Sequence, residues 1–85
     1  MTLTELNQLK LSDEVIVTKT MKQYDLYRGD YLIYLEYHNE RRSYNFLYVD
    51  KKGLTNILHL PPSIHNNIED SQLYQRLENL KSLGL

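Results

Sequence analysis

The sequence predicts a small α+β domain: a four-stranded antiparallel β-meander flanked by a short N-terminal helix and a C-terminal amphipathic helix. Residues 31–38 and 43–49 are two β-prone runs separated by a short polar turn, and residues 14–21 form a third such run. Residues 71–83 repeat leucine at helical spacing. With 85 residues, the chain has the length of one domain, which we expect to span residues 1–85.

The N-terminal third is predicted to contain one short helix and one strand. Thr2 and Glu5 have the spacing of a capping box, which predicts a helix from about residue 3 to 9. Residues 14–21 are rich in β-branched side chains, which favour a strand. Residues 23–30 then connect this strand to the next one.

The hairpin formed by residues 31–38 and 43–49 holds most of the aromatic side chains of the chain. Seven of the eight tyrosines lie between Tyr24 and Tyr48, together with the only phenylalanine. The turn predicts that the facing pairs are Tyr37 with Tyr44, Leu35 with Phe46, Ile33 with Tyr48, and Leu32 with Val49. Alternation along each strand then predicts one face without polar residues, made of Tyr31, Ile33, Leu35, Tyr37, Tyr44, Phe46 and Tyr48. A helix or a partner has to cover such a face.

The opposite face of the predicted hairpin is partly apolar. It combines Leu32, Tyr34, Leu47 and Val49 with Glu36, His38, Ser43 and Asn45. Two interpretations remain open for it. Either the N-terminal helix packs on this face, or the face binds a partner.

A fourth strand is expected at residues 54–60, because Gly53 permits a tight turn before it and Pro61 ends it. We call the predicted hairpin face without polar residues the aromatic face. A three-residue loop would place Leu54, Leu58 and Leu60 on it. A four-residue loop would place Thr55, Ile57 and His59 there. We prefer the first register because it is more apolar.

The C-terminal helix is predicted at residues 71–83. Leu73, Leu77 and Leu80 recur at i, i+4 and i+7, and Gly84 suits the C-cap. This helix is the expected cover for the aromatic face.

Composition makes several classes of protein improbable. A formal net charge of −1 gives no overall attraction to a phosphate backbone. The absence of cysteine is typical of a reducing compartment and leaves no thiolate metal site. The N-terminus shows neither a signal peptide nor a membrane span. We therefore expect a soluble, cytoplasmic protein without a membrane partner.

The polar residues do not form a convincing active site. One polar group is expected on the partly apolar face of the hairpin, made of Glu36, His38, Ser43 and Asn45, with His59 approaching it. No oxyanion donor or nucleophile elbow accompanies this group. The histidines lack metal-binding spacing. We interpret this group as a solvated sheet face and expect no enzymatic activity, no catalytic residue, no metal and no cofactor.

These observations indicate a small non-enzymatic protein-binding module that acts as an inhibitor, adaptor or self-associating regulator. Its partner is another protein or a second copy of itself in a homodimer. By analogy alone, such a size would suit an inhibitor carried by a phage or mobile element. The predicted protein-binding residues are Leu32, Tyr34, Leu47 and Val49, with Arg41 and Arg42 at the rim.

The alternative function is single-stranded nucleic-acid binding by aromatic and basic residues in the loops. Tyrosine rings can stack on bases while cations contact phosphates. The residues predicted for this function are Lys22, Tyr24, Tyr27, Arg28, Lys51 and Lys52. Asp25, Asp30 and Asp50 are expected at the same end of the sheet, and their negative charges would weaken binding to a nucleic acid.

Overall fold

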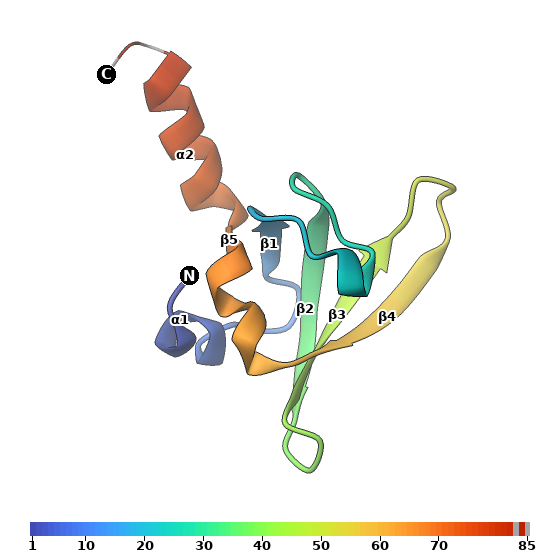
Figure 1. Cartoon of the computed structure of the whole chain (residues 1–85). Coiled ribbons are helices and arrows are strands. Elements are labelled where there is room, and N and C mark those ends of the chain that lie inside the picture. The colour runs from blue at the N-terminus through green and yellow to red at the C-terminus, as the bar shows by residue number, and fades with distance from the viewer. Residues whose placement is uncertain (83, 85) are drawn as a thin grey trace.

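The computed structural model describes residues 1–82 and 84, and in this part of the chain it shows an α+β domain built on one five-stranded antiparallel sheet (Figure 1). The sheet has the order β4-β3-β2-β1-β5. Its strands are β1 (Glu14–Val17), β2 (Tyr31–His38), β3 (Ser43–Val49), β4 (Thr55–Leu60) and β5 (Ile68–Asp70). The helical elements are α1 (Leu3–Asn7), η1 (Lys22–Tyr24), η2 (Pro62–Asn67) and α2 (Ser71–Ser82). The predicted fold class is confirmed.

The fifth strand was not expected. No strand was predicted between Pro61 and the C-terminal helix, but the 3-10 helix η2 brings the chain back to the sheet there, at β5. β5 pairs with β1, with Val15 opposite Asp70 and Val17 opposite Ile68. A strand of three residues is too short to show an alternation of apolar and polar residues in the sequence. These residues are extended because they pair with β1, and a local pattern does not reveal that pairing.

β1 is shorter than predicted, because the chain leaves the sheet after Val17 instead of continuing to Met21. Met21 and Leu26 form a small antiparallel bridge between themselves, and both side chains are buried. Asp25 closes this tight loop with a φ of 56°, in the left-handed region.

A bulge in β2 changes the predicted faces of the hairpin. Near the turn the prediction holds, with Tyr37 opposite Tyr44. The register then shifts between Tyr34 and Glu36, so Tyr34 lies opposite Phe46 where Leu35 was expected. An extra residue in one strand reverses the alternation beyond it. Leu32 and Tyr34 therefore join Phe46 on one face, while Tyr31, Ile33 and Leu35 leave it.

The core lies on the face of the sheet that carries Phe46. Strands β3 and β4 take the preferred register there, with Tyr44 opposite Leu60 and Phe46 opposite Leu58. Leu54 falls outside the strand and is exposed. The sheet side chains of this face, which we call the core face, are Leu32, Tyr34, Tyr44, Phe46, Leu58 and Leu60.

Three segments cover the core face, and the C-terminal helix is not among them. α1 contributes Leu6, η2 contributes Ile64, and the connection between β1 and β2 contributes Met21 and Leu26. All four side chains are at most 2% exposed. The prediction that the C-terminal helix covers the aromatic residues is therefore wrong, because shorter segments fill that space.

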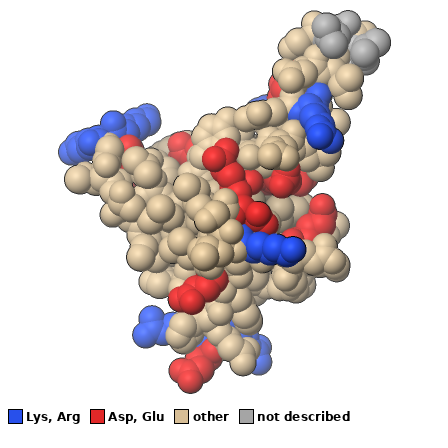
Figure 2. All heavy atoms as spheres, turned by 180° about the vertical axis from the view of Figure 1, so that it is seen from behind, with Lys and Arg blue, Asp and Glu red and all other residues tan. Residues whose placement is uncertain are grey.

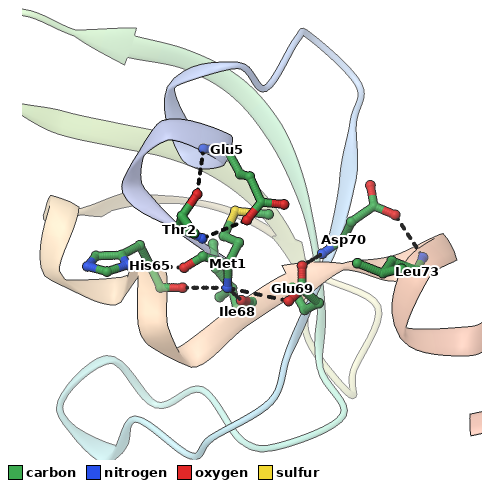
Figure 3. A network of polar contacts seen from close by, with 8 residues as sticks. All are labelled: Met1, Thr2, Glu5, His65, Ile68, Glu69, Asp70 and Leu73. Carbon is green, nitrogen blue, oxygen red and sulfur yellow. Dashed lines mark hydrogen bonds and ion pairs between the residues drawn. The ribbon is translucent and has the colours of Figure 1, made fainter. Parts of the chain in front are cut away.

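A network of polar contacts holds α1 against η2 and β5 (Figure 3). The Met1 amino group donates to the carbonyl oxygens of His65 and Ile68, at 2.9 and 2.6 Å, and lies 3.6 Å from Glu69 Oε2. Thr2 and Glu5 form the predicted capping box, and its hydrogen bonds lower the pKa of Glu5. These contacts fix the N-terminal segment beside the last strand.

α2 projects away from the sheet (Figure 1). It begins where β5 ends, and Asp70 Oδ1 accepts a hydrogen bond of 2.9 Å from the Leu73 amide at its start. Its contacts with the sheet are to β1 and β5. The helix begins at the predicted residue; its predicted end at Leu83 lies outside the described residues, and Gly84 has the positive φ, 76°, expected near a helix end.

Candidate functional site

The most distinctive surface of the protein is the side of the sheet opposite the core face. Cross-strand pairing joins Glu14, Ile33, Leu47 and Ile57 into one row that crosses four strands. Paired residues share a face, so three apolar side chains stand side by side in this row. With their neighbours Tyr31 and Val49 they form a surface that we call the open face. We include in it Leu35, the unpaired and partly exposed residue of the bulge, so the open face is made of Tyr31, Ile33, Leu35, Leu47, Val49 and Ile57.

The open face is accessible to solvent. Tyr31, Val49 and Ile57 are 45, 53 and 57% exposed, and the other three residues are partly exposed. Within residues 1–82 and 84, α1 and η2 contribute their buried side chains to the core face, and the main contacts of α2 with the sheet are to β1 and β5. The view from behind in Figure 2 shows this side, with a broad area free of charged side chains and both acidic and basic side chains beside it. Contiguous apolar surface of this kind marks interaction sites.

One end of the open face contains a hollow of about 330 Å³. Apolar side chains of β2 and β3 line it together with two carboxylates, Glu14 and Asp30. The hydroxyl of Tyr48 lies 3.4 Å from Asp30 Oδ2, and burial, followed by this carboxylate, raises the pKa of Tyr48. The lining residues are Glu14, Gly29, Asp30, Tyr31, Ile33, Leu47, Tyr48 and Val49. The hollow thus suits an apolar group that has a cation beside it.

The structure divides the predicted protein-binding residues between the two faces. Leu47 and Val49 lie on the open face, but Leu32 is fully buried and Tyr34 is 8% exposed on the core face. The ring of Tyr34 packs edge-on against Phe46, with 5.6 Å between the ring centroids. The placement of Leu32 and Tyr34 on a contact surface is therefore wrong, and the cause is the bulge in β2.

The two predicted rim residues lie in the turn between β2 and β3. Arg41 and Arg42 are exposed there, and Arg42 has a positive φ of 49°. Because β2 ends and β3 begins at this turn, both arginines lie at the far end of the hairpin from the hollow.

Sequence reasoning missed Tyr31, Ile33, Leu35 and Ile57 as surface residues. The first three were assigned to the face that needed a cover. Ile57 falls on the opposite face in the preferred register, which the structure takes, but it was not included among the contact residues. A β-bulge has no fixed sequence signature outside glycine-containing types, so the hairpin sequence held no signal for this reversal.

The polar cluster expected on the same side of the sheet is present at the turn end. Glu36, Asn45 and His59 form one cross-strand row, and His38 lies opposite Ser43. Asn45 Oδ1 accepts a hydrogen bond of 2.7 Å from His59 Nδ1. His38 Nδ1 and Ser43 Oγ are both buried without a hydrogen-bond partner, so no hydrogen bond joins these two side chains in the structure.

The predicted nucleic-acid residues do not form a single surface. Tyr27, Lys51 and Lys52 line a second hollow of about 370 Å³, which they share with Asp25 and Asp50. The contact with the Asp25 carboxylate raises the pKa of Tyr27. Two carboxylates beside two lysines leave this hollow without a net positive charge.

The other three residues of that prediction are not among those that line this hollow. Lys22 is exposed on η1, whereas Tyr24 packs against the core. Arg28 lies beside α2, where the Tyr74 hydroxyl, and to a smaller extent the Glu78 carboxylate, raise the pKa of the guanidinium.

Comparison with known proteins gives no functional assignment. No protein-family model matches the sequence, and no curated protein or solved structure is significantly similar to the chain. Among the described residues, no helix is long and apolar enough to cross a membrane, and no three His, Cys, Asp or Glu side chains are grouped as metal ligands.

Proposed function

We propose that the protein is a small non-enzymatic protein-binding module whose contact surface is the open face. One observation carries this proposal: in the described part of the chain, strands β2, β3 and β4 carry neighbouring apolar side chains on one face that stay partly or largely exposed. Protein interfaces combine such an apolar centre with a polar rim. Here the rim consists of Glu14, Asp30 and Glu36, with Arg41 and Arg42 at the turn.

The role we propose is that of an inhibitor, adaptor or self-associating regulator acting in the cytoplasm. Binding through a preformed sheet face needs no catalytic group, and little backbone ordering accompanies it. Leu47 and Val49 remain in the proposed contact, and Tyr31, Ile33, Leu35 and Ile57 replace the two core residues.

The test is photochemical cross-linking in the native host. Ile57 is replaced by a photoreactive phenylalanine analogue, because it is exposed and lies at the end of the apolar row. The matched control carries the same analogue at Glu40, an exposed position in the turn between β2 and β3. We expect one discrete adduct from position 57 and none from position 40. If position 57 gives no adduct, the open face does not bind protein.

Single-stranded nucleic-acid binding is the second candidate, because Tyr27, Lys51 and Lys52 meet in one hollow. It predicts that fluorescence anisotropy detects binding of a single-stranded oligonucleotide at low salt. The affinity should fall steeply as salt is added and should decrease in Lys51→Ala. An unchanged anisotropy at low salt removes this candidate.

A further inference from the structure

α2 carries a second uncovered apolar surface. Leu73, Leu77 and Leu80 are 42, 48 and 45% exposed, and their spacing places them on one side of the helix. We call these three residues the leucine stripe. Tyr74 and Glu78, on another side of α2, lie near Arg28 of the chain's own domain. The leucine stripe therefore faces away from the sheet to which α2 is attached.

Cations flank the leucine stripe on both sides. Arg76 directly precedes Leu77, and Lys81 directly follows Leu80, so each lies about 100° around the helix from its neighbour. Both basic side chains are exposed. Lys81 lies 3.7 Å from Glu78 on an exposed surface, a contact that contributes little. The stripe thus presents an apolar centre with positive edges.

The open face has the complementary pattern. Its apolar row is bordered by the exposed carboxylate of Glu14, and its hollow also contains Asp30. None of the residues of β2, β3 and β4 is Lys or Arg. At this hollow the apolar surface has carboxylates and no Lys or Arg in its lining, which complements an apolar stripe with positive edges. Arg41 and Arg42 lie at the other end of the same face.

The dimensions also agree. A helix of 12 residues is about 18 Å long. A strand of eight residues, such as β2, spans about 26 Å. An amphipathic helix packed on the apolar face of a sheet is the usual way in which an α+β domain covers such a face. The leucine stripe could therefore cover the open face, and the open face could bury the leucine stripe.

We propose that the occupant of the open face is α2 of a second copy of this chain, in a two-fold symmetric dimer in which each copy donates its leucine stripe to the other. This inference rests on the proposed function, since it names the partner of the same face. A two-fold exchange uses the contact twice and covers both apolar surfaces of both copies. For a chain of this length, whose core is small, that burial adds to a thin stability margin.

The experiment measures molar mass by light scattering and sedimentation over a range of protein concentrations. We expect the wild type to approach twice the chain mass of 10.2 kDa as concentration rises. Leu77→Glu places a carboxylate in the stripe, and Ile57→Glu places one in the open face. Each change occurs twice per dimer and should raise the dissociation constant at least about 100-fold.

Matched controls place the same carboxylate on the other side of each element. Gln75→Glu lies away from the leucine stripe on α2, and Asn56→Glu lies on the core side of β4, where it is exposed. Both should associate as the wild type does. Circular dichroism spectra and melting temperatures identify any variant that fails to fold, and all four positions are exposed.

A mixing experiment separates this exchange from other dimers. Leu77→Glu keeps an intact open face and Ile57→Glu keeps an intact stripe, so an equimolar mixture restores one of the two helix-to-sheet contacts. We expect the mixture to form heterodimers at concentrations where each variant alone is monomeric. A dimer made of two stripes or of two open faces cannot be restored in this way, so a monomeric mixture overturns the proposed exchange.

A wild type that stays monomeric at all concentrations also overturns it. Cross-linking from position 57 then shows whether the open face binds any other protein. An adduct with a different protein would leave the open face as a docking surface and exclude only the second copy, whereas no adduct would reject both proposals.

Discussion

The two faces of strands β2, β3 and β4 are both apolar, yet only one of them is a core. The core face is covered by α1, η2 and the connection between β1 and β2, and Phe46, Leu32 and Leu60 are at most 1% exposed there. The open face exposes Val49 and Ile57 by more than half. Strand composition therefore does not decide which face is buried. Burial depends on which other segments of the chain pack on each face.

The largest expected difference between the faces is in packing energy. Leu60→Ala removes a fully buried side chain of β4 and should lower the free energy of unfolding by about 2 to 5 kcal/mol. Urea unfolding followed by circular dichroism measures this loss. A cost below about 1 kcal/mol would mean that the core face is not closely packed in solution.

The attachment of α1 to the core face should give the second largest effect. The hydroxyl of Tyr44 donates to Asn7 Oδ1 at the end of α1. Asn7→Ala leaves the largely buried tyrosine hydroxyl without its acceptor and should cost about 1 to 3 kcal/mol. Tyr44→Phe in the same background should recover part of the loss in urea unfolding. If Asn7→Ala has no effect, α1 does not close this face.

Alkaline pH should weaken the packing of the core face. Burial, ahead of the charges of Tyr44 and Glu36, raises the pKa of Tyr34 above its ordinary value of 10.0, and burial likewise raises that of Tyr44. The folded state favours the neutral phenol, so the unfolded chain loses these protons first as pH rises. The free energy of unfolding should thus be unaffected by these groups below pH 10 and should fall above it.

Tyr34→Phe provides the control for the alkaline effect. This variant lacks one titrating hydroxyl, so its unfolding free energy should decline less steeply above pH 10 than that of the wild type. Equal slopes in urea titrations of the two proteins would show that Tyr34 is not buried on the core face.

The smallest effect is expected on the open face. Ile57→Ala removes methyl groups from β4 just as Leu60→Ala does, but from a side chain that is 57% exposed. In dilute solution it should change the free energy of unfolding by no more than about 0.5 kcal/mol. A loss as large as that of Leu60→Ala would show that another part of the chain covers the open face.

Local patterns in the sequence predicted much of the fold. The hairpin strands begin and end at the predicted residues, and Thr2 and Glu5 form the expected capping box. Leu58 and Leu60 point to the aromatic face as preferred. Each of these features depends on neighbouring residues or on one turn, so alternation and capping rules were sufficient.

The sequence could not reveal the features that depend on distant contacts. The bulge between Tyr34 and Glu36 moves Leu32 and Tyr34 to the core face, and nothing in the strand sequence marks it. The leucine periodicity of α2 predicted that these residues form a helix, but not which surface the helix packs against. A stripe of leucines can pack against any apolar surface, so the sequence does not identify that surface. Two of the six predicted contact residues, Leu32 and Tyr34, changed face for the first reason.

The most direct test of the two-face account is an NMR measurement with a water-soluble paramagnetic probe. At low concentration, the methyl signals of Ile33, Leu47 and Ile57 should broaden strongly, while those of Leu60 and Ile64 stay sharp. As concentration rises, the open-face signals and those of Leu77 should become protected together. Open-face methyls that are as protected as Leu60 in dilute solution would contradict the account, because that face would already be covered within one chain.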